Sequence, residues 1–346
     1  MSDGSKTHRI GIFGPFMLLV LAFAGWSAYW FVAARALETR INTQQTALIS
    51  QGYQISADPW HVSGYPFRMF VALDHLTVIA PSGHGLSAPR FEAEANAYAL
   101  DKWVMVAPQG LTLYRGHHNG ADWGTLAVSG KSLKASASNL TKPIGNIAIE
   151  GSGLTLVASD PSHPFAFDTA ELVEAYLRPT VGHDDSADFL LRVSGARGQP
   201  QSLAGQLAQD KPLSLHAEGA LSRVSSFAAG AQGQATARWH AAGGAVSGLH
   251  VQLLADDLDV EAKSDNLTFG PDNRAVGHMD VAMTGALQPI GVMAALHLIS
   301  AENLTLATPL LDMTLVTKGT QKFPLDFKDG GAYIGALKVS DAPILP

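Results

Sequence analysis

The sequence predicts a mainly β protein: an N-terminal transmembrane helix followed by a large, mostly antiparallel, curved β-sheet or sandwich with a few short helices. Three observations support this fold class. One long uncharged apolar run lies near the N-terminus. Apolar and polar residues then alternate in many segments, which is typical of half-buried strands. Gly, Asn, Asp and Pro separate these segments at hairpin distances.

The apolar run covers residues 10–34 and contains no charged side chain. About 20 apolar residues suffice for a helix to cross the hydrocarbon layer of a membrane. Trp26, Tyr29 and Trp30 lie near its C-terminal end, where aromatic rings favour the headgroup layer. The short arm before it, residues 1–9, is basic. We therefore expect a transmembrane helix with a cytoplasmic N-terminus.

A cleaved signal peptide is the alternative. The sequence Ala22-Phe23-Ala24 has the small-x-small pattern of a cleavage site. However, the apolar run continues for about ten residues beyond this site, whereas a signal peptide ends in a polar mature start. The pattern favours a retained anchor, with everything after about residue 35 exported.

A stalk helix is expected directly after the membrane. Residues 35–51 contain neither proline nor glycine, and Leu37, Ile41 and Leu48 recur at helical spacing. Gly52 is expected to end this helix and to begin an exported β-rich domain that covers residues 52–346.

Period-two alternation dominates the exported domain. Parallel sheets need a helix between successive strands and continuous apolar runs, and neither recurs here, so the sheet should be mostly antiparallel. The segments with the clearest alternation are 91–98, 133–138, 213–218, 235–240, 249–253, 258–263 and 279–284.

Two short helices are expected within the sheet. Asp168 to Glu171 resembles a capping box, which predicts a helix near 169–178. Pro289 occupies a first-turn position, which predicts a second helix over 289–300. The polar stretch 196–212 is the expected boundary between two β-rich halves.

Composition and motifs exclude several classes of function. The chain has no cysteine, so disulfides, thiolate metal sites and cysteine nucleophiles are excluded. Its net charge is −7 and it lacks the clustered Lys and Arg of nucleic-acid-binding proteins, so we expect no nucleic-acid partner. Gly130-Lys131-Ser132 lacks the upstream glycine of a phosphate-binding loop. Neither a Gly-x-Ser-x-Gly elbow nor a His-Glu-x-x-His motif occurs. We expect no enzyme activity and no cofactor.

Two segments are dense in potential metal ligands. His117 and His118 precede Asp122, and His183 precedes three aspartates within 184–188. Adjacent histidines on a strand point to opposite faces, so one ion could not easily take both. Flanking glycines indicate solvated loops in each case. The pattern therefore favours no metal site.

An aromatic turn is the most distinctive segment of the exported domain. Trp60, Tyr65, Phe67 and Arg68 lie among two prolines and a glycine, just before a predicted strand. The favoured interpretation is a structural corner at the first edge of the sheet, with Arg68 paired to a carboxylate. The alternative is an aromatic binding lip near the membrane.

One strand offers a candidate apolar groove. In 91–98, Phe91, Ala93, Ala95 and Ala97 share one face. The apolar face of a sheet must be covered by a second sheet, by helices or by an apolar ligand. The small alanines would leave room for an acyl chain in an open groove. Closure by a second sheet, which would make a sandwich, remains the other possibility.

Three motifs resemble an alphaproteobacterial family of uncharacterised proteins, DUF family 2125, over nearly the whole chain. They are Gly52-Tyr53-Gln54-Ile55, then Trp60 with Gly64-Tyr65-Pro66-Phe67-Arg68, and finally the segment from Phe327 to Gly335. The resemblance implies an inner-membrane anchor with a periplasmic domain, and it supplies neither an activity nor functional residues.

The layout of one helix and a long, low-charge sheet is also similar to AsmA-type envelope proteins, whose curved sheets are associated with lipid handling. Fold analogy does not establish function. The leading hypothesis is a non-enzymatic envelope protein whose partners are the membrane bilayer and a lipid or another apolar ligand. The alternative is a structural or assembly factor that binds envelope proteins.

Overall fold

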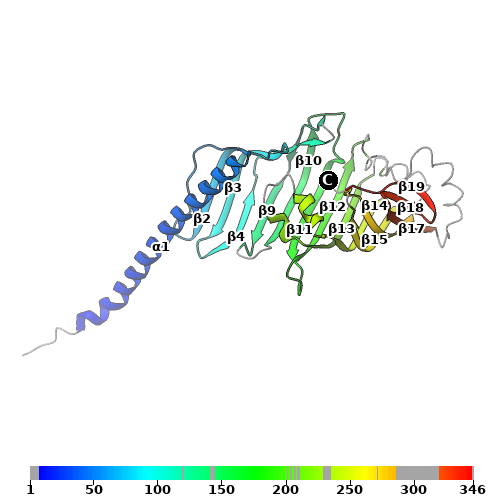
Figure 1. The fold of residues 1–346 in the computed structure, drawn as a ribbon. Coiled ribbons are helices and arrows are strands. Elements are labelled where there is room, and N and C mark those ends of the chain that lie inside the picture. Colours follow the sequence, from blue (N-terminus) through cyan, green and yellow to red (C-terminus); the bar gives the residue numbers. More distant parts are fainter. Residues whose placement is uncertain are drawn as a thin grey trace, which may run out of the picture.

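One long helix and one large antiparallel sheet make up the computed structural model of the chain (Figure 1). Helix α1 (His8–Ser50) leads into a 17-stranded sheet in which all pairings of neighbouring strands are antiparallel. The predicted fold class is confirmed. The structure describes residues 8–118, 121–140, 145–200, 202, 205, 208, 211–228, 235–270, 272–285 and 319–344.

The sheet is mostly a meander, because most strands pair with the strand that precedes them in the chain; the exceptions are β5, which pairs with β3, β8, which pairs with β5, and β9, which pairs with β4. β4 and β5 pair with different parts of the same edge of β3, and β8 and β9 pair with different parts of the same edge of β10. A separate two-stranded hairpin joins β6 to β7. The bounds are β1 Gln54–Ser56, β2 Arg68–Ile79, β3 His84–Asn96, β4 Ala99–Val106, β5 Leu111–Arg115, β6 His117–His118, β7 Ala121–Asp122, β8 Thr125–Ser129, β9 Ser132–Ser138, β10 Asn146–Ala158, β11 Phe167–Pro179, β12 Ser186–Gly198, β13 Leu213–Ser222, β14 Val246–Ala255, β15 Leu258–Phe269, β16 Ala275–Thr284, β17 Thr320–Lys328, β18 Gly331–Ile334 and β19 Leu337–Asp341.

Helix α1 has two different environments along its length. Its first part is long and apolar enough to cross a membrane, and large side chains from Phe16 to Phe23 are exposed there. In its second part, Trp30 and Ala34 are buried against Met69 and Val71 of β2. The helix therefore lies against the sheet after it leaves the apolar segment, along β2 and β3 (Figure 1).

Irregular positions within the strands keep the apolar residues on one face. Gly153 of β10 and Gly195 of β12 have φ values of 55° and 60°, which glycine adopts readily. The register between β12 and β13 shifts at the second position, between Val193 and Ala196. As a result these two residues, three apart, are both buried. A bulge of this kind also bends the strand and increases its twist.

The last strands close one end of the core. Phe323, Leu325 and Phe327 of β17 are buried together with Ala332 and Val339. An isolated bridge between Arg274 and Ile344 brings the end of the described chain back to the start of β16. Asp329 and Gly330 form the turn between β17 and β18.

The helix expected near 169–178 is wrong, because these residues lie in strand β11. β11 pairs with β10 on one side and with β12 on the other. Val173, Ala175 and Leu177 point to one face, while Glu174 and Tyr176 alternate with them. The same residues satisfy both a helical and a period-two pattern, and pairing with two neighbours selects the strand.

The strand expected over 235–240 is also wrong, because these residues form helix α4 (Ala235–Ala241) after the short helix α3 (Ser225–Ala228). Trp239 is 2% exposed and packs against Phe227 and Phe269. Its indole N–H donates to the carbonyl of Ser222. The helical conformation of α4 buries this large side chain against the ends of neighbouring strands. This burial favours a helix at 235–240 instead of the expected strand.

Two other expectations concern the segments between strands, namely the helix at 289–300 and the boundary at 196–212. The helix expected over 289–300 lies outside the described residues. The boundary expected at 196–212 falls between β12 and β13, and these strands pair directly from Ser186–Ser222 to Ala196–Leu213. The sheet therefore continues across this connection.

Candidate functional site: an uncovered apolar strip

A single row of apolar side chains crosses the sheet. Each member is the register partner of the next, so all of them lie on the same face, which we call the apolar face. The opposite face is called the polar face. In order, the row is Val71, Ala93, Met105, Ala135, Ile149, Ala175, Leu191, Ala217, Val251, Ala262, Val281 and Phe323.

Large and small side chains alternate along most of this row. Alanines on β3, β9, β11, β13 and β15 separate Val, Met, Ile and Leu residues on the strands between them. Neighbouring strands are about 4.8 Å apart, so two large side chains in the row stand about 10 Å apart. Each alanine therefore leaves a gap between the large side chains of the two neighbouring strands.

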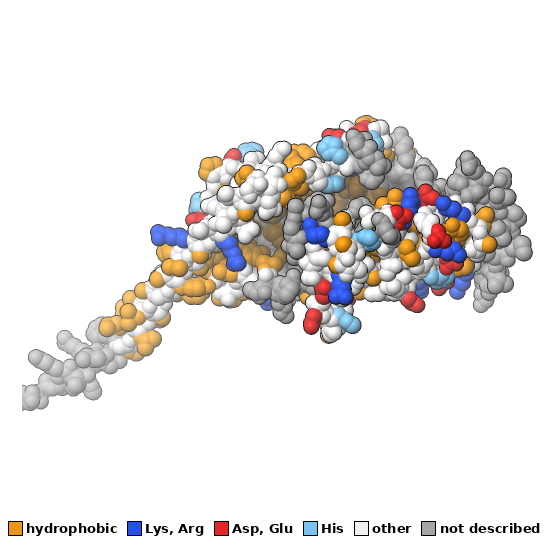
Figure 2. All heavy atoms as spheres, viewed as in Figure 1, with side chains coloured by type: hydrophobic (Ala, Val, Ile, Leu, Met, Phe, Trp, Pro, Cys, Tyr) orange, Lys and Arg blue, Asp and Glu red, His pale blue; other side chains and the backbone are white. Residues whose placement is uncertain are grey.

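The row is covered at both ends and open in the middle. Val71 is 4% exposed under α1, and Phe323 is 2% exposed in the C-terminal core. Between them, Ile149 is 51% exposed and Ile147, two residues earlier on the same strand, is 44% exposed. Figure 2 shows hydrophobic side chains along α1 and in the hollow beside it. We call the open region the apolar strip; it comprises Ala135, Ala137, Ile147, Ile149, Ala175 and Leu177.

The apolar strip lies near one set of strand ends, at the edge of the sheet from which the apolar part of α1 extends. Asn146 at the start of β10 pairs with Ser138, which in turn pairs with Lys102 near the start of β4. The same edge carries Pro66, whose carbonyl accepts a hydrogen bond from the indole of Trp26 at 2.9 Å. A membrane crossed by α1 would therefore lie at this edge.

The residues predicted to form a groove lie on the covered part of the apolar face. Phe91, Ala93 and Ala95 are partners of Leu73, Val71 and Met69 on β2. Ala95 is 3% exposed and Ala97 is 0% exposed. The Ala97 carbonyl accepts a hydrogen bond from Tyr29 of α1 at 3.0 Å. Helix α1 thus covers this stretch, and the exposed part of the same face begins farther along the sheet.

The aromatic turn holds α1 against the sheet. The hydroxyl of Tyr65 lies 2.7 Å from that of Ser27, and its ring stacks on Phe31 at 5.5 Å. Trp30 meets the same ring edge-on and donates its indole N–H to the Arg68 carbonyl at 2.9 Å. These contacts fix the angle between helix α1 and strand β2.

The other members of the turn have different surroundings. Trp60 is partly buried in the cluster beneath α1, whereas Phe67 is 63% exposed. The guanidinium of Arg68 pairs with Glu94 of β3 at 2.8 Å, on the polar face. Both partners of this ion pair are exposed, so its contribution to stability is small.

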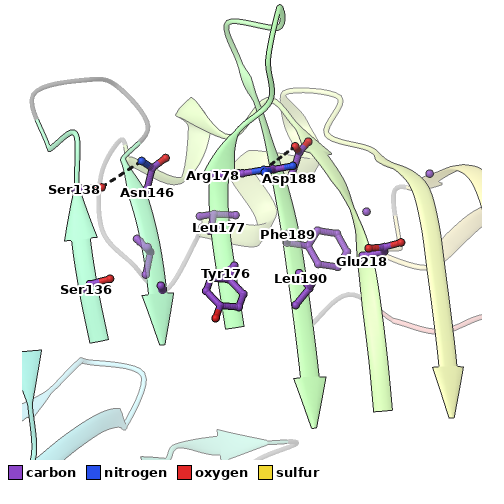
Figure 3. A pocket seen from close by; sticks show the side chains of 14 residues that line it. Ser136, Ser138, Asn146, Tyr176, Leu177, Arg178, Asp188, Phe189, Leu190 and Glu218 are labelled. Atoms are coloured by element: carbon purple, nitrogen blue, oxygen red, sulfur yellow. Dashed lines mark hydrogen bonds and ion pairs between the residues drawn. The ribbon is translucent and has the colours of Figure 1, made fainter. Parts of the chain in front are cut away.

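The polar face carries ion pairs and a cavity of about 630 Å³ (Figure 3). Arg178 pairs with Asp188 at 3.2 Å at one end of it. Tyr176 donates a hydrogen bond to Glu174 at 2.8 Å, and this bond raises the pKa of the tyrosine. The lining is mixed, because Ile147 and Leu177 of the apolar strip also border the cavity, together with Ala148, Phe189 and Leu190. The labelled polar side chains that line the cavity are Ser136, Ser138, Asn146, Tyr176, Arg178, Asp188 and Glu218.

The two ligand-rich segments of the sequence do not gather three ligands in the described part of the chain. His117 faces Asp122 across the β6–β7 hairpin. Asp185 accepts a hydrogen bond from the Ser225 backbone, and Asp188 is paired with Arg178.

A different group with metal-ligand chemistry occurs on the polar face at His216, Glu218 and His250, which sequence reasoning missed. The spacing His216-x-Glu218 within a predicted strand could have indicated this group, because alternation along a strand places both side chains on the same face.

The fold and the strip define a class of protein: a single apolar helix docked onto a long meander sheet whose apolar face is partly uncovered. Residues 30–343 match the family described as an uncharacterized protein conserved in bacteria (DUF2125), and the chain belongs to this family. Neither a curated protein nor a solved structure matches the chain.

Proposed function

We propose that this protein is anchored in the bacterial inner membrane by α1 and binds the acyl chains of a lipid along the apolar strip. The observation that carries the proposal is the row from Val71 to Phe323, which is buried at both ends and half-exposed at Ile149. An apolar ligand would complete the coverage that α1 and the C-terminal strands begin.

The chemistry of the strip suits a hydrocarbon chain. Its side chains are alanine, isoleucine and leucine, and the ion pairs of neighbouring strands lie on the polar face. Burying one side chain the size of isoleucine stabilises a complex by about 1.5–3 kcal/mol relative to leaving it in water. Covering Ile147, Ile149 and their neighbours would therefore give useful affinity without any charged contact.

The length of the free part of α1 places the strip close to lipid. Residues 10–22 precede the first contact of α1 with the turn before β2, between Phe23 and Tyr65, and at 1.5 Å per residue they span about 20 Å. The hydrocarbon layer is about 30 Å thick and takes about 20 helical residues to cross, so the segment of α1 that contacts the turn would reach the boundary of this layer. The basic arm before the helix favours a cytoplasmic N-terminus and a periplasmic sheet.

The test uses a lipid with a photoreactive acyl chain in vesicles that contain the full-length protein. After irradiation, mass spectrometry of peptides locates the label. We expect label in α1 and in the peptides that carry Ala135, Ile149 and Ala175. The double change Ile147→Gln and Ile149→Gln should remove the label from the strip and leave the label on α1.

The matched control is Val104→Gln. Val104 is 53% exposed, close to the value for Ile149, but it is the register partner of Glu94 and lies on the polar face. This variant should keep the strip labelled. A wild-type protein labelled on α1 alone would overturn the proposal, and it would favour the alternative of an assembly factor whose strip binds a protein partner.

A further inference from the structure

Three side chains on the polar face have the geometry of a metal site. His216 and Glu218 are two apart on β13, so they share a face, and His250 of β14 is the register partner of Glu218. One ligand atom from each side chain lies within 4.8 Å of the others. Two adjacent strands of a sheet therefore bring two imidazoles and one carboxylate to a common point.

The distances fit a shared ion better than direct hydrogen bonds. His216 Nε2 lies 3.3 Å from Glu218 Oε2, and His250 Nδ1 lies 3.6 Å from Glu218 Oε1. Charge-assisted N–H···O bonds are about 2.7–2.9 Å long, so both separations exceed them. Two ligands on a tetrahedral zinc ion, each about 2.0–2.1 Å from the metal, lie about 3.4 Å apart.

A further carboxylate orients one imidazole. His250 Nε2 lies 2.9 Å from Glu261 Oε1, and Lys263 Nζ holds that same oxygen at 2.7 Å. If Nε2 donates its proton to Glu261, Nδ1 keeps its lone pair for an ion on the side of Glu218. Metal-ligating histidines almost always donate their second ring N–H in this way.

The surrounding charges leave Glu218 free for a cation. Within the described ranges, Glu218 has ion-pair partners only in His216 and His250. The nearby cations are already occupied: Arg192 pairs with Glu174 at 3.1 Å, and Lys263 pairs with Glu261. A neutral pair of imidazoles would leave one uncompensated carboxylate here, which favours a divalent ion.

We propose that His216 Nε2, the Glu218 carboxylate and His250 Nδ1 bind one divalent ion of the zinc class, with water completing its coordination. Imidazole with one carboxylate suits Zn²⁺ and Co²⁺, whereas Mg²⁺ and Ca²⁺ prefer sites made of oxygen atoms alone. Glu218 also lines the cavity of about 630 Å³, so the water position is accessible from that cavity. The ion would link β13 to β14 across the helical segment that separates them.

The first experiment uses the full-length protein in detergent after its metals have been removed with a chelator. Addition of Zn²⁺ should raise the melting temperature and bind one ion per chain, and Mg²⁺ should do neither. Co²⁺ should give the visible absorption of a four-coordinate site with nitrogen ligands. Wild-type protein that binds no Zn²⁺ or Co²⁺ at one equivalent would overturn the proposal.

Variants then assign the ligands. His216→Gln and His250→Gln should each abolish the Co²⁺ absorption and weaken Zn²⁺ binding at least tenfold. Glu261→Gln should weaken binding about 10–100-fold, as loss of an orienting partner does. If a histidine variant fails to fold, the nearly isosteric Glu218→Gln decides the question by the same two measurements.

The matched control is His278→Gln. His278 is also a partly exposed histidine of the polar face, and it lies between Asp280 and Asp326. Its Nδ1 forms a short hydrogen bond with Asp326 at 2.7 Å, and its Nε2 faces Asp280 at 3.3 Å. The His278→Gln protein should bind Zn²⁺ as the wild type does. Equal loss of binding in this control would contradict the assignment to His216, Glu218 and His250.

Discussion

Ile149 of β10 lies directly between Ala135 of β9 and Ala175 of β11, with an alanine as its register partner on each side. Its side chain therefore projects above its neighbours from the middle of a row that is buried at its two ends. All side chains in the row are apolar, and the residues differ in whether α1 or the C-terminal strands cover them. This contrast between similar side chains makes the following predictions possible.

Ala95→Glu should destabilise the sheet strongly. Ala95 is 3% exposed beneath α1, so a glutamate there would overfill the packing and bury an unpaired charge. We expect a loss of several kcal/mol in the free energy of unfolding, measured by chemical denaturation of the full-length protein in detergent. Ile149→Glu, on the same face but half-exposed, should stay folded with nearly the wild-type midpoint. Equal midpoints for the two variants would contradict the difference in covering.

Trp30→Ala should release α1 from the sheet. Trp30 is 4% exposed, packs on Met69 and donates a hydrogen bond to the Arg68 carbonyl. Loss of a buried tryptophan costs about 3–5 kcal/mol. Proteolysis of the purified protein should become faster within 35–51, because this part of the helix would no longer be held. Val32→Ala, at a position 69% exposed on the same helix, should leave the rate unchanged.

Arg68→Gln should change stability little. The Arg68–Glu94 pair is 2.8 Å long, but the two side chains are 63% and 38% exposed. Exposed pairs contribute about 0–1 kcal/mol, and screening by salt reduces this further. Thermal unfolding at low and high salt should show a shift of at most a few degrees. A large loss would mean that the arginine does more in the turn than pair with Glu94.

Asp326→Asn should reduce stability more in acid than in alkali. The hydrogen bond that His278 donates to Asp326, with a second to Asp280, raises the pKa of His278 above its usual 6.5. The folded protein therefore holds this proton more tightly than the unfolded chain does. The resulting stabilisation is fully present below about pH 6.5 and is lost as the pH rises through the raised pKa.

Melting temperatures of wild type and Asp326→Asn at pH 5.5 and pH 8.5 would measure this effect, and the difference should be larger at pH 5.5. In a His278→Gln background, Asp326→Asn should have the same effect at both pH values. A pH-dependent effect that persists without the histidine would assign it to another group.

Much of the fold could be predicted because it depends on local pattern. Alternation located β9, β13, β14, β15 and β16, and the uncharged run located the apolar part of α1. The helix predicted near 169–178 was wrong, because residues 172–177 satisfy a helical stripe and an alternating strand equally well. Only the pairing of β11 with two neighbours decides between them, and pairing depends on residues far away in the sequence.

The candidate sites were less predictable for a related reason. Alternation shows that Ala95 and Ile149 each lie on an apolar face, but it does not show which part of that face α1 covers. The metal ligands present the same difficulty, because His250 is 32 positions from Glu218 in the sequence, about one hairpin and one helical segment away, and only the register of β13 with β14 brings them together. Local pattern predicts faces, and long-range register determines which residues meet on them.

The meander order has a consequence for how the chain folds. In the main sheet every strand from β10 to β19 pairs with the strand immediately before it, so most strand pairs form between sequence neighbours. Sheets built in this way have low contact order and avoid the entropic cost of closing long loops. A chain that lengthens from its N-terminus can therefore add strands one after another to a growing edge. Each new strand then protects the previous edge from pairing with other chains.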